Sequence, residues 1–255
     1  MNVIKKVLIR VRAKLILLNN RIKISRSRKR LLKLHNIHKG KRCFIIGNGP
    51  SLDVKDLEKL KGEICFGTHR IYEIFDKTDW RPTYYCAQDS QLINQSAKFI
   101  SNIQAKQKFI GMVKSRKYAS IKGATYVSLI LDSFYPELPK FSEDVSNGIF
   151  EGFTVSYMCF QIALYMGFSE VYLLGIDHNY SKALQPDGTI LENDKIQDHF
   201  SEKDQIENVP QLFKSSLAYK KVSVYAKEIG VRICNATRGG KLDVFERVDF
   251  DSLFH

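Results

Sequence analysis

The stretch Cys43-Phe-Ile-Ile-Gly-Asn-Gly-Pro-Ser-Leu52 decides the fold. Its apolar half, Cys43–Ile46, is typical of a buried parallel strand. The chain then enters a turn of small residues, Gly47–Ser51, where glycine allows a positive φ and lets a ligand approach the backbone. Pro50 and Ser51 suit the start of a helix, with Ser51 as the cap or Pro50 just inside. Because free N–H groups at a helix start bind anions, the stretch predicts a site for a nucleotide or another phosphate-bearing ligand.

Two better-known phosphate-binding fingerprints are absent from this stretch. Leu52 stands where the third glycine of Gly-x-Gly-x-x-Gly belongs, and no Gly-Lys-Ser/Thr follows as it does in a Walker loop. An ordinary tight strand-to-helix turn is therefore an alternative, and the choice depends on the rest of the chain.

Strand and helix patterns alternate after this turn. Strands are expected at 43–46, 63–67, 83–87, 108–112, 124–131, 170–175 and 231–235, and helices at 54–61, 70–75, 92–103, 154–166 and 211–229. Residues 132–147 and 179–210 are expected to be irregular. This alternation favours an α/β fold, a Rossmann-like doubly wound and mostly parallel sheet. We divide the chain into a basic amphipathic N-terminal extension, 1–40, and a Rossmann-like nucleotide-binding catalytic domain, 41–255.

Polar residues follow several of the expected strands. Besides the glycine turn they are His69, Gln88, Asp89, Asp177, His178 and the segment Asn235–Arg238. Ligands of doubly wound sheets bind outside the carboxyl ends of the strands, so this convergence favours a nucleotide site over a plain turn. Asp89 and Asp177 leave a Mg²⁺ site with two carboxylates open, but no metal-binding motif accompanies them and we assign no metal site.

Positive charge is concentrated at the N-terminus. Residues 1–42 contain 15 of the 40 Lys and Arg residues and no Asp or Glu. The remainder is close to neutral, which argues against nucleic acid as a partner. Apolar and basic residues alternate through the first 18 positions, as in a helix lying on an anionic membrane surface. A helix packed on a partner protein is an alternative; an RNA-binding arm is disfavoured because 1–42 contains no aromatic residue.

Other features of the sequence bear on its cellular location. No run of 18 apolar residues is present, and the N-terminus lacks the cleavage site of a signal peptide. The five cysteines are scattered, and none forms Cys-x-x-Cys, which is typical of buried thiols in a reducing compartment. We expect a cytoplasmic protein held peripherally on the inner membrane face.

Three blocks of sequence resemble known families. Ile45–Leu52, Tyr157–Asp177 and Asn235–Phe254 are similar to a 6-hydroxymethylpterin diphosphokinase-like family of polysaccharide-cluster proteins, over roughly residues 40–255. The first two blocks also resemble bacterial sialyltransferases that use CMP-sialic acid on a Rossmann-like sheet, over roughly residues 40–200. These motifs are more specific for fold than for reaction.

The sialyltransferase resemblance implies roles for individual residues. Those implied to contact the nucleotide are Gly47, Asn48, Gly49 and Ser51 in the glycine turn and, at its phosphate, Thr154 and Ser156. Tyr180 would help the phosphate to leave, and His199 would be the general base, with His178 as the next candidate. In two places the chain departs from that pattern: the Asn after the second strand is replaced by His69 or is shifted, and the Arg that precedes the central helix has no clear match, with Glu151 nearby.

From these resemblances we expect a glycosyltransferase of bacterial surface-polysaccharide biosynthesis. Its donor would be a nucleotide sugar, with a CMP-activated acidic sugar as the first candidate, and its acceptor a glycan or a lipid-linked glycan. It would require no cofactor. The alternatives are a Mg²⁺-dependent diphosphokinase of the hydroxymethylpterin type and a non-catalytic nucleotide-binding scaffold; a homo-oligomer is also open.

Overall fold

A computed structural model describes residues 3–200 and 209–254. Helices and strands alternate along it, as predicted. In chain order they are α1 (Val3–Leu32), β1 (Arg42–Ile46), α2 (Val54–Lys59), β2 (Cys65–Thr68), the 3₁₀ helix η1 (Ile71–Ile74), β3 (Tyr84–Ala87), α3 (Ser90–Gln95), α4 (Ala97–Asn102), β4 (Gln107–Met112), β5 (Ala124–Ile130), β6 (Ile149–Phe150), α5 (Val155–Tyr165), β7 (Glu170–Leu174), β8 (Lys182–Leu184), β9 (Ile190–Glu192), α6 (Leu212–Glu228), β10 (Arg232–Asn235), β11 (Glu246–Arg247) and η2 (Asp251–Phe254).

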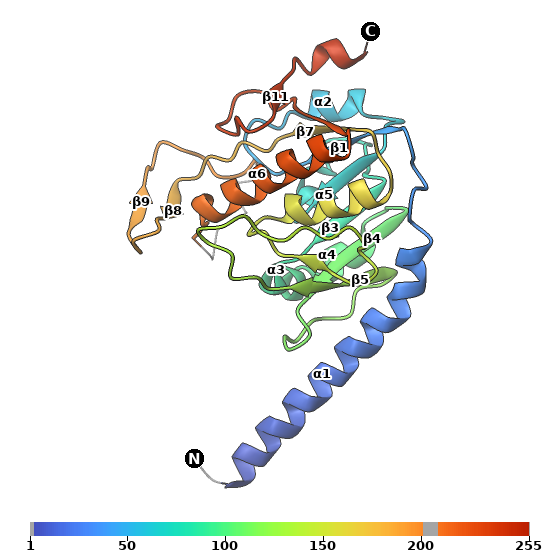
Figure 1. The fold of residues 1–255 in the computed structure, drawn as a ribbon, viewed down its shortest axis with the longest axis vertical. Coiled ribbons are helices and arrows are strands. Elements are labelled where there is room, and N and C mark those ends of the chain that lie inside the picture. The colour runs from blue at the N-terminus through green and yellow to red at the C-terminus, as the bar shows by residue number, and fades with distance from the viewer. Residues whose placement is uncertain (1–2, 201–208, 255) are drawn as a thin grey trace.

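In the described residues, nine strands form one parallel sheet in the order β11-β10-β7-β1-β2-β3-β4-β5-β6 (Figure 1). The chain enters this sheet in the middle, at β1, and adds strands on one side of β1 as far as β6. It then returns to the other side of β1 with β7, β10 and β11. The strand order therefore reverses between β1 and β7. The predicted α/β fold with a doubly wound, mostly parallel sheet is confirmed.

Both faces of this sheet are covered. Side chains alternate along β1: Cys43 and Ile45 join a buried cluster with helices α5 and α6, whereas Phe44 and Ile46 join a second cluster with helices α2, α3 and α4. Each fully buried Ile or Phe side chain contributes about 1.5–3 kcal/mol to stability by leaving water. Burial on both faces explains why the strands read as continuous apolar runs rather than as alternating ones.

The start of α2 differs from the prediction. Asp53 is the N-cap, and its carboxylate accepts the backbone N–H of Lys55. The chain first makes a turn in which the N–H of Leu52 donates to the carbonyl of Gly49, so Pro50 and Ser51 lie before the helix. The helix start expected at Pro50 or Ser51 was therefore wrong, and the N–H of Lys55 at the actual start already donates to a carboxylate. Anion binding at the glycine turn stays a prediction.

Two further elements were predicted incorrectly. The helix expected at 92–103 is divided into α3 and α4 at Ser96, a buried residue whose hydroxyl accepts from Tyr72. The segment 179–210, expected to be irregular, contains the antiparallel hairpin β8–β9. Its strands have three residues each and include exposed side chains, so they show no clear alternation.

Helix α1 is only partly in contact with the sheet. Its N-terminal half extends away from the rest of the molecule (Figure 1), whereas its C-terminal half packs beside β5. There Asn20 donates to the carbonyls of Lys114 and Arg116, and the N–H of Tyr126 donates to Ser27 Oγ over 2.9 Å.

The division of the chain into two parts at residue 40 stays a prediction. Over 3–200 and 209–254, no helix has the length and apolar character needed to cross a membrane.

Candidate functional site

A cavity of about 800 Å³ lies at the carboxyl ends of β1, β2, β3 and β7. Gly47–Gly49 follow β1, Thr68 ends β2 with His69 after it, and Gln88 and Asp89 follow β3. On the other side of the reversal in strand order, the segment 175–180 follows β7. In doubly wound sheets the ligand crevice lies at this reversal, so the topology itself marks the cavity as the candidate site.

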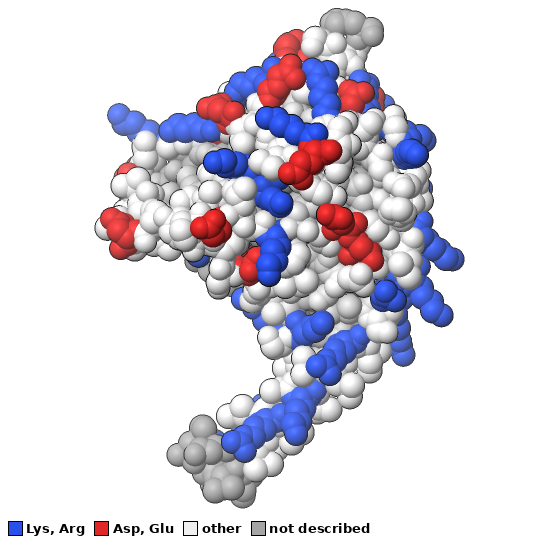
Figure 2. Space-filling view, in the orientation of Figure 1, with Lys and Arg blue, Asp and Glu red and all other residues white. Residues whose placement is uncertain are grey.

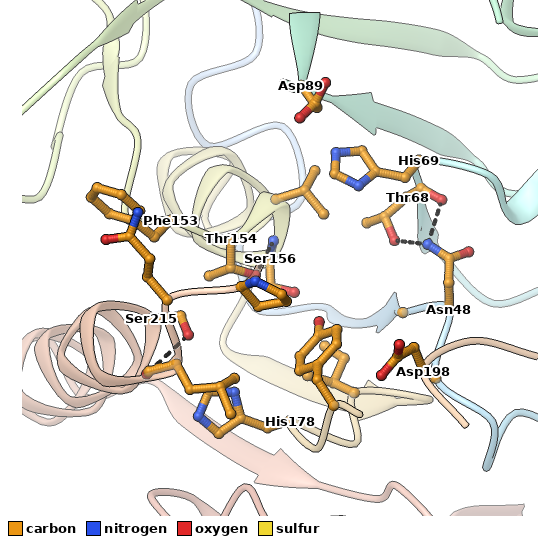
Figure 3. Close-up of a pocket in the computed structure, with 18 of the residues that line it drawn as sticks. Asn48, Thr68, His69, Asp89, Phe153, Thr154, Ser156, His178, Asp198 and Ser215 are labelled. Atoms are coloured by element: carbon orange, nitrogen blue, oxygen red, sulfur yellow. Dashed lines mark hydrogen bonds between the residues drawn. The ribbon is translucent and has the colours of Figure 1, made fainter. Parts of the chain in front are cut away.

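Nearly all of the predicted site residues meet in this cavity (Figure 3). Its wall includes Gly47, Asn48, Gly49, His69, Gln88, Asp89, Thr154, Ser156, Asp177, His178, Tyr180 and His199. Ser51 lies outside the wall, and its hydroxyl donates to Asp177 Oδ2 over 2.8 Å. Ser51 therefore orients a cavity carboxylate. The roles proposed for these residues stay predictions.

The glycines of the turn contact the neighbouring strand end. Neither Gly47 nor Gly49 has a positive φ. The N–H of Gly49 donates to the carbonyl of Gly175 over 2.8 Å, and a Cβ on Gly49 would overlap the carboxylate of Asp177. A Cβ on Gly47 would overlap the carbonyl of Gly175 in the same way. These glycines thus let the ends of β1 and β7 pack together, rather than providing the positive φ expected from the sequence.

Strained backbone is concentrated around the cavity. His69, Phe153 and His178 have φ angles of 43°, 56° and 51°, in the left-handed region that bulky residues rarely adopt. All three line the cavity. At His69 the conformation is fixed from both sides, because its N–H donates to Cys86 O and its carbonyl accepts from Tyr85 Oη. Such strain costs about 1–3 kcal/mol per residue and gathers at ligand-binding sites.

Several buried polar atoms of the wall lack a partner within the described part of the chain. Asn48 Nδ2 donates to the carbonyl of Thr68 and Gln88 Nε2 to that of Glu151, which leaves Asn48 Oδ1 and Gln88 Oε1 without donors. His69 Nε2 is also unpartnered. A buried polar atom without a partner costs about 1–3 kcal/mol. A ligand that donates to the two amide oxygens would remove this cost.

Burial also changes the charge of the site. It lowers the pKa of His69 to about 4 and that of His178 to about 4, so both rings are neutral at pH 7. Burial raises the pKa of Asp177, an effect that the hydrogen bond from Ser51 opposes. It likewise raises the pKa of Glu151. His178 Nε2 lies 2.8 Å from Ser216 Oγ, and its ring stands edge-on to Tyr219.

Two helices begin at the cavity wall. Thr154 caps α5 by accepting the N–H of Ser156, and Thr154 Oγ1 lies 3.3 Å from Tyr219 Oη. Helix α6 starts after Gln211, which provides no side-chain cap. Neither helix has an acidic residue in its first turn. Since the N-terminus of a helix carries partial positive charge, the two starts favour an anionic group in the cavity.

Sequence reasoning missed part of the wall. Arg116, Phe153, Asp198, Ser215 and Tyr219 all line the cavity. Tyr219 and Ser215 lie on a helix whose apolar periodicity indicates only a core-facing side, so no local signal separates them from core residues. Arg238, which follows a strand, does not line the cavity: it pairs with the carboxylates of Asp56 and Asp251.

A family model described as "6-hydroxymethylpterin diphosphokinase MptE-like" matches residues 17–183. The chain belongs to the MptE-like family. The resemblance to this family seen in the sequence is thereby confirmed. The matched segment of this MptE-like chain contains the cavity residues that follow β1, β2, β3 and β7, but it ends before α6. No curated protein matches the chain.

A solved structure shares the fold of this MptE-like chain. The MAf glycosyltransferase from Magnetospirillum magneticum AMB-1 superimposes with a TM-score of 0.50 at 13% sequence identity. The match covers 90% of this chain and 39% of that one, so the chain spans well under half the length of its structural relative. At this identity the likeness establishes a common fold alone.

Proposed function

We propose that the MptE-like chain is a glycosyltransferase whose cavity binds a nucleotide-activated sugar. The observation that carries the proposal is that helices α5 and α6 both start at a cavity whose wall contains buried amide oxygens in need of hydrogen-bond donors. The helix starts suit a phosphate. The amide oxygens suit a group rich in N–H and O–H, which a base and its sugars provide.

The polar wall supports a cytidine nucleotide as the first donor to test. Asn48 Oδ1 and Gln88 Oε1 are acceptors, and their amide orientations are determined because each NH₂ group donates to a backbone carbonyl. The exocyclic amine of cytosine and the ribose hydroxyls are donors of the required kind. The resemblance of the first two sequence blocks to CMP-sialic-acid-dependent enzymes also favours a CMP-activated acidic sugar.

His199 is the stronger candidate for the general base. Its ring lies 6.2 Å from that of Tyr180, centroid to centroid, and both line the cavity. Burial holds the pKa of His178 near 4, which makes that ring a weak base at neutral pH. In the proposed step, His199 takes the proton of the acceptor hydroxyl as its oxygen bonds to the donor sugar. The bond from sugar to phosphate breaks, and the nucleotide leaves with the electron pair. The acceptor would be a glycan or lipid-linked glycan of a bacterial surface polysaccharide.

A diphosphokinase that uses Mg²⁺ is the second candidate, because the family model is described as 6-hydroxymethylpterin diphosphokinase MptE-like. Asp89 and Asp177 both line the cavity and could hold Mg²⁺ together with substrate phosphates. Each carboxylate already accepts hydrogen bonds, Asp89 from the start of α3 and Asp177 from Ser51. Over 3–200 and 209–254, no cluster of three metal-binding side chains is found. The ion would therefore depend on the phosphates for most of its ligands.

Calorimetry with CMP, CMP-sialic acid, UDP, GDP and ATP, each with and without Mg²⁺, tests the proposal. We expect the cytidine compounds to bind without metal and the donor to be hydrolysed slowly. His199→Ala should lower that turnover by roughly 10²–10⁴-fold with donor affinity nearly unchanged. His35→Ala, at an exposed histidine beside Tyr165 at the far end of α5, is the matched control and should have no effect. ATP binding only with Mg²⁺, with pyrophosphate transfer to a pterin, would establish the second candidate instead.

A further inference from the structure

The outward face of α1 is apolar and exposed. Its side chains recur every three or four residues, which places them in one stripe along the helix. Within the described side chains, the outward stripe consists of Val7, Leu8, Val11, Leu15, Leu18 and Ile22. These residues are between 41% and 60% exposed. An apolar stripe of this length on an isolated, projecting helix indicates that another surface covers it.

The opposite face of α1 accounts for its attachment to the molecule. Asn20, Ser27 and Leu31 are almost fully buried, and the first two are hydrogen-bonded to the segment between β4 and β5 and to β5. They lie about half a helical turn away from Leu15, Leu18 and Ile22. Because α1 is held by this face, the outward stripe cannot be buried by folding back onto the sheet.

Charge decides which surface fits the outward stripe. Lys5, Arg12, Lys14 and Arg21 border it on both sides, and exposed cations at positions 26, 29 and 33 continue the same face toward the sheet. The first 42 residues contain no acidic residue. Figure 2 shows Lys and Arg along the projecting helix without Asp or Glu. The matching surface must therefore be both apolar and anionic.

A second copy of the chain is a poor match. The spacing of the outward stripe resembles a coiled-coil seam, but in a self-paired coil the bordering cations would face each other. Coiled coils also use borders of mixed charge to set register, whereas a uniform cationic border specifies none. A bilayer needs no register, and its anionic headgroups attract Lys and Arg while its acyl chains receive the stripe.

We propose that the outward stripe of α1 docks on an anionic lipid bilayer, lying parallel to the surface with its bordering cations among the headgroups. The proposal uses no residue of the cavity, so it holds or fails independently of the proposed function. Docking should require both components of the face. It should be absent on neutral lipid, and it should weaken as salt screens the cations.

Flotation of the full chain with phosphatidylcholine vesicles, with and without phosphatidylglycerol, tests the proposal. The test variant is Leu15→Glu/Leu18→Glu, in the stripe. The matched control is Ile9→Glu/Ala13→Glu, on the opposite side of the helix at two exposed positions. Both pairs change the net charge equally, so only the position of the new carboxylates differs. We expect the full chain to float with anionic vesicles only. The test variant should lose at least about ten-fold in partition coefficient because two leucines no longer enter the lipid, and the control should keep most of it.

Three results would overturn the proposal. The first is no flotation of the full chain, or equal flotation with neutral and anionic vesicles. The second is an equal effect of the two variant pairs, which would mean that net charge rather than the stripe governs binding. The third is a lipid-free dimer, detected by light scattering, that Leu15→Glu/Leu18→Glu converts to a monomer, because a second copy would then cover the stripe. Matching circular-dichroism melts for both variants verify that neither has unfolded.

Discussion

Gly49 and Asp177 provide a direct test of the contact between the ends of β1 and β7. In Gly49→Ala the new methyl group would occupy the place of the Asp177 carboxylate. The carboxylate cannot move aside without losing its 2.8 Å hydrogen bond from Ser51. From the sequence alone, Gly49 is expected to bring the backbone close to the ligand, so Gly49→Val is expected to abolish nucleotide binding with the fold intact. The structure predicts a loss of stability as well.

The size of the effect follows from three contributions. Overpacking costs about 1–3 kcal/mol, and loss of a hydrogen bond to a charged group costs about 1.5–3 kcal/mol. Restricting the unfolded chain by Gly→Ala offsets about 0.4–1 kcal/mol. We therefore expect Gly49→Ala to lower the free energy of unfolding by about 3 kcal/mol. In an Asp177→Ala background the carboxylate is gone, although the carbonyl of Gly175, 2.9 Å from the new methyl, still crowds it, and the cost should fall to about 1 kcal/mol.

Urea unfolding of the wild type, both single variants and the double variant, followed by circular dichroism, measures this coupling. We expect an interaction free energy of about 2 kcal/mol, well above the deviation of about 0.5 kcal/mol found for independent sites. Gly67→Ala is the matched control, since this β2 glycine has no positive φ and its nearest contacts are to Pro82 and Ile71. Its cost should add to that of Asp177→Ala. Additive costs for Gly49→Ala and Asp177→Ala would refute the contact.

Three further predictions concern the cavity and the attachment of α1. Burial holds the pKa of His69 near 4, below its ordinary 6.5, so the folded protein resists protonation of this ring while the unfolded chain does not. The stability that the neutral ring contributes is fully present above pH 6.5 and is lost as the pH falls toward 4. Between pH 7 and pH 5 the free energy of unfolding should therefore drop by about 2 kcal/mol more in the wild type than in His69→Gln, as measured by urea titrations at the two pH values. Thr154→Val removes the cap of α5 and should cost about 1 kcal/mol of stability. It should also weaken nucleotide binding in calorimetry, whereas unchanged affinity would mean that the start of α5 does not contact the ligand. Asn20→Ala removes the two hydrogen bonds to the carbonyls of Lys114 and Arg116 and should cost about 1–3 kcal/mol, with faster amide hydrogen exchange at residues 114–118 and no change there in a variant at exposed Asn19.

The strands of the sheet were predictable because their signal is local. Cys43–Ile46, for example, is an apolar run that stops at a glycine, and burial on both faces produces this pattern wherever the strand lies. The convergence of His69, Gln88 and Asp177 was predictable for a related reason. Parallel strands bring their carboxyl ends to one edge, so the meeting of residues that follow strands can be predicted even when the strand order is unknown.

What the sequence could not indicate depends on distant contacts. The partner of Gly49 is Asp177, far along the chain, and no feature near either residue records their proximity. The left-handed conformations of His69, Phe153 and His178 were missed because the local preference of these residues is against them, and tertiary contacts impose them. The β8–β9 hairpin is too short and too exposed to carry a hydrophobic period.

The central place of β1 affects the order in which the sheet can be completed during synthesis. β1 ends at Ile46, but the strand that covers one of its edges, β7, ends at Leu174. Until β7 has left the ribosome, that edge of β1 has unpaired N–H and C=O groups, and such an edge is a template for association with other chains. A fragment that stops before residue 170 would keep the edge open permanently, and it should aggregate when expressed. A fragment cut at residue 183, where the family match ends, would leave the outer edge of β7 unpaired, because β10 and the covering helix α6 would be missing.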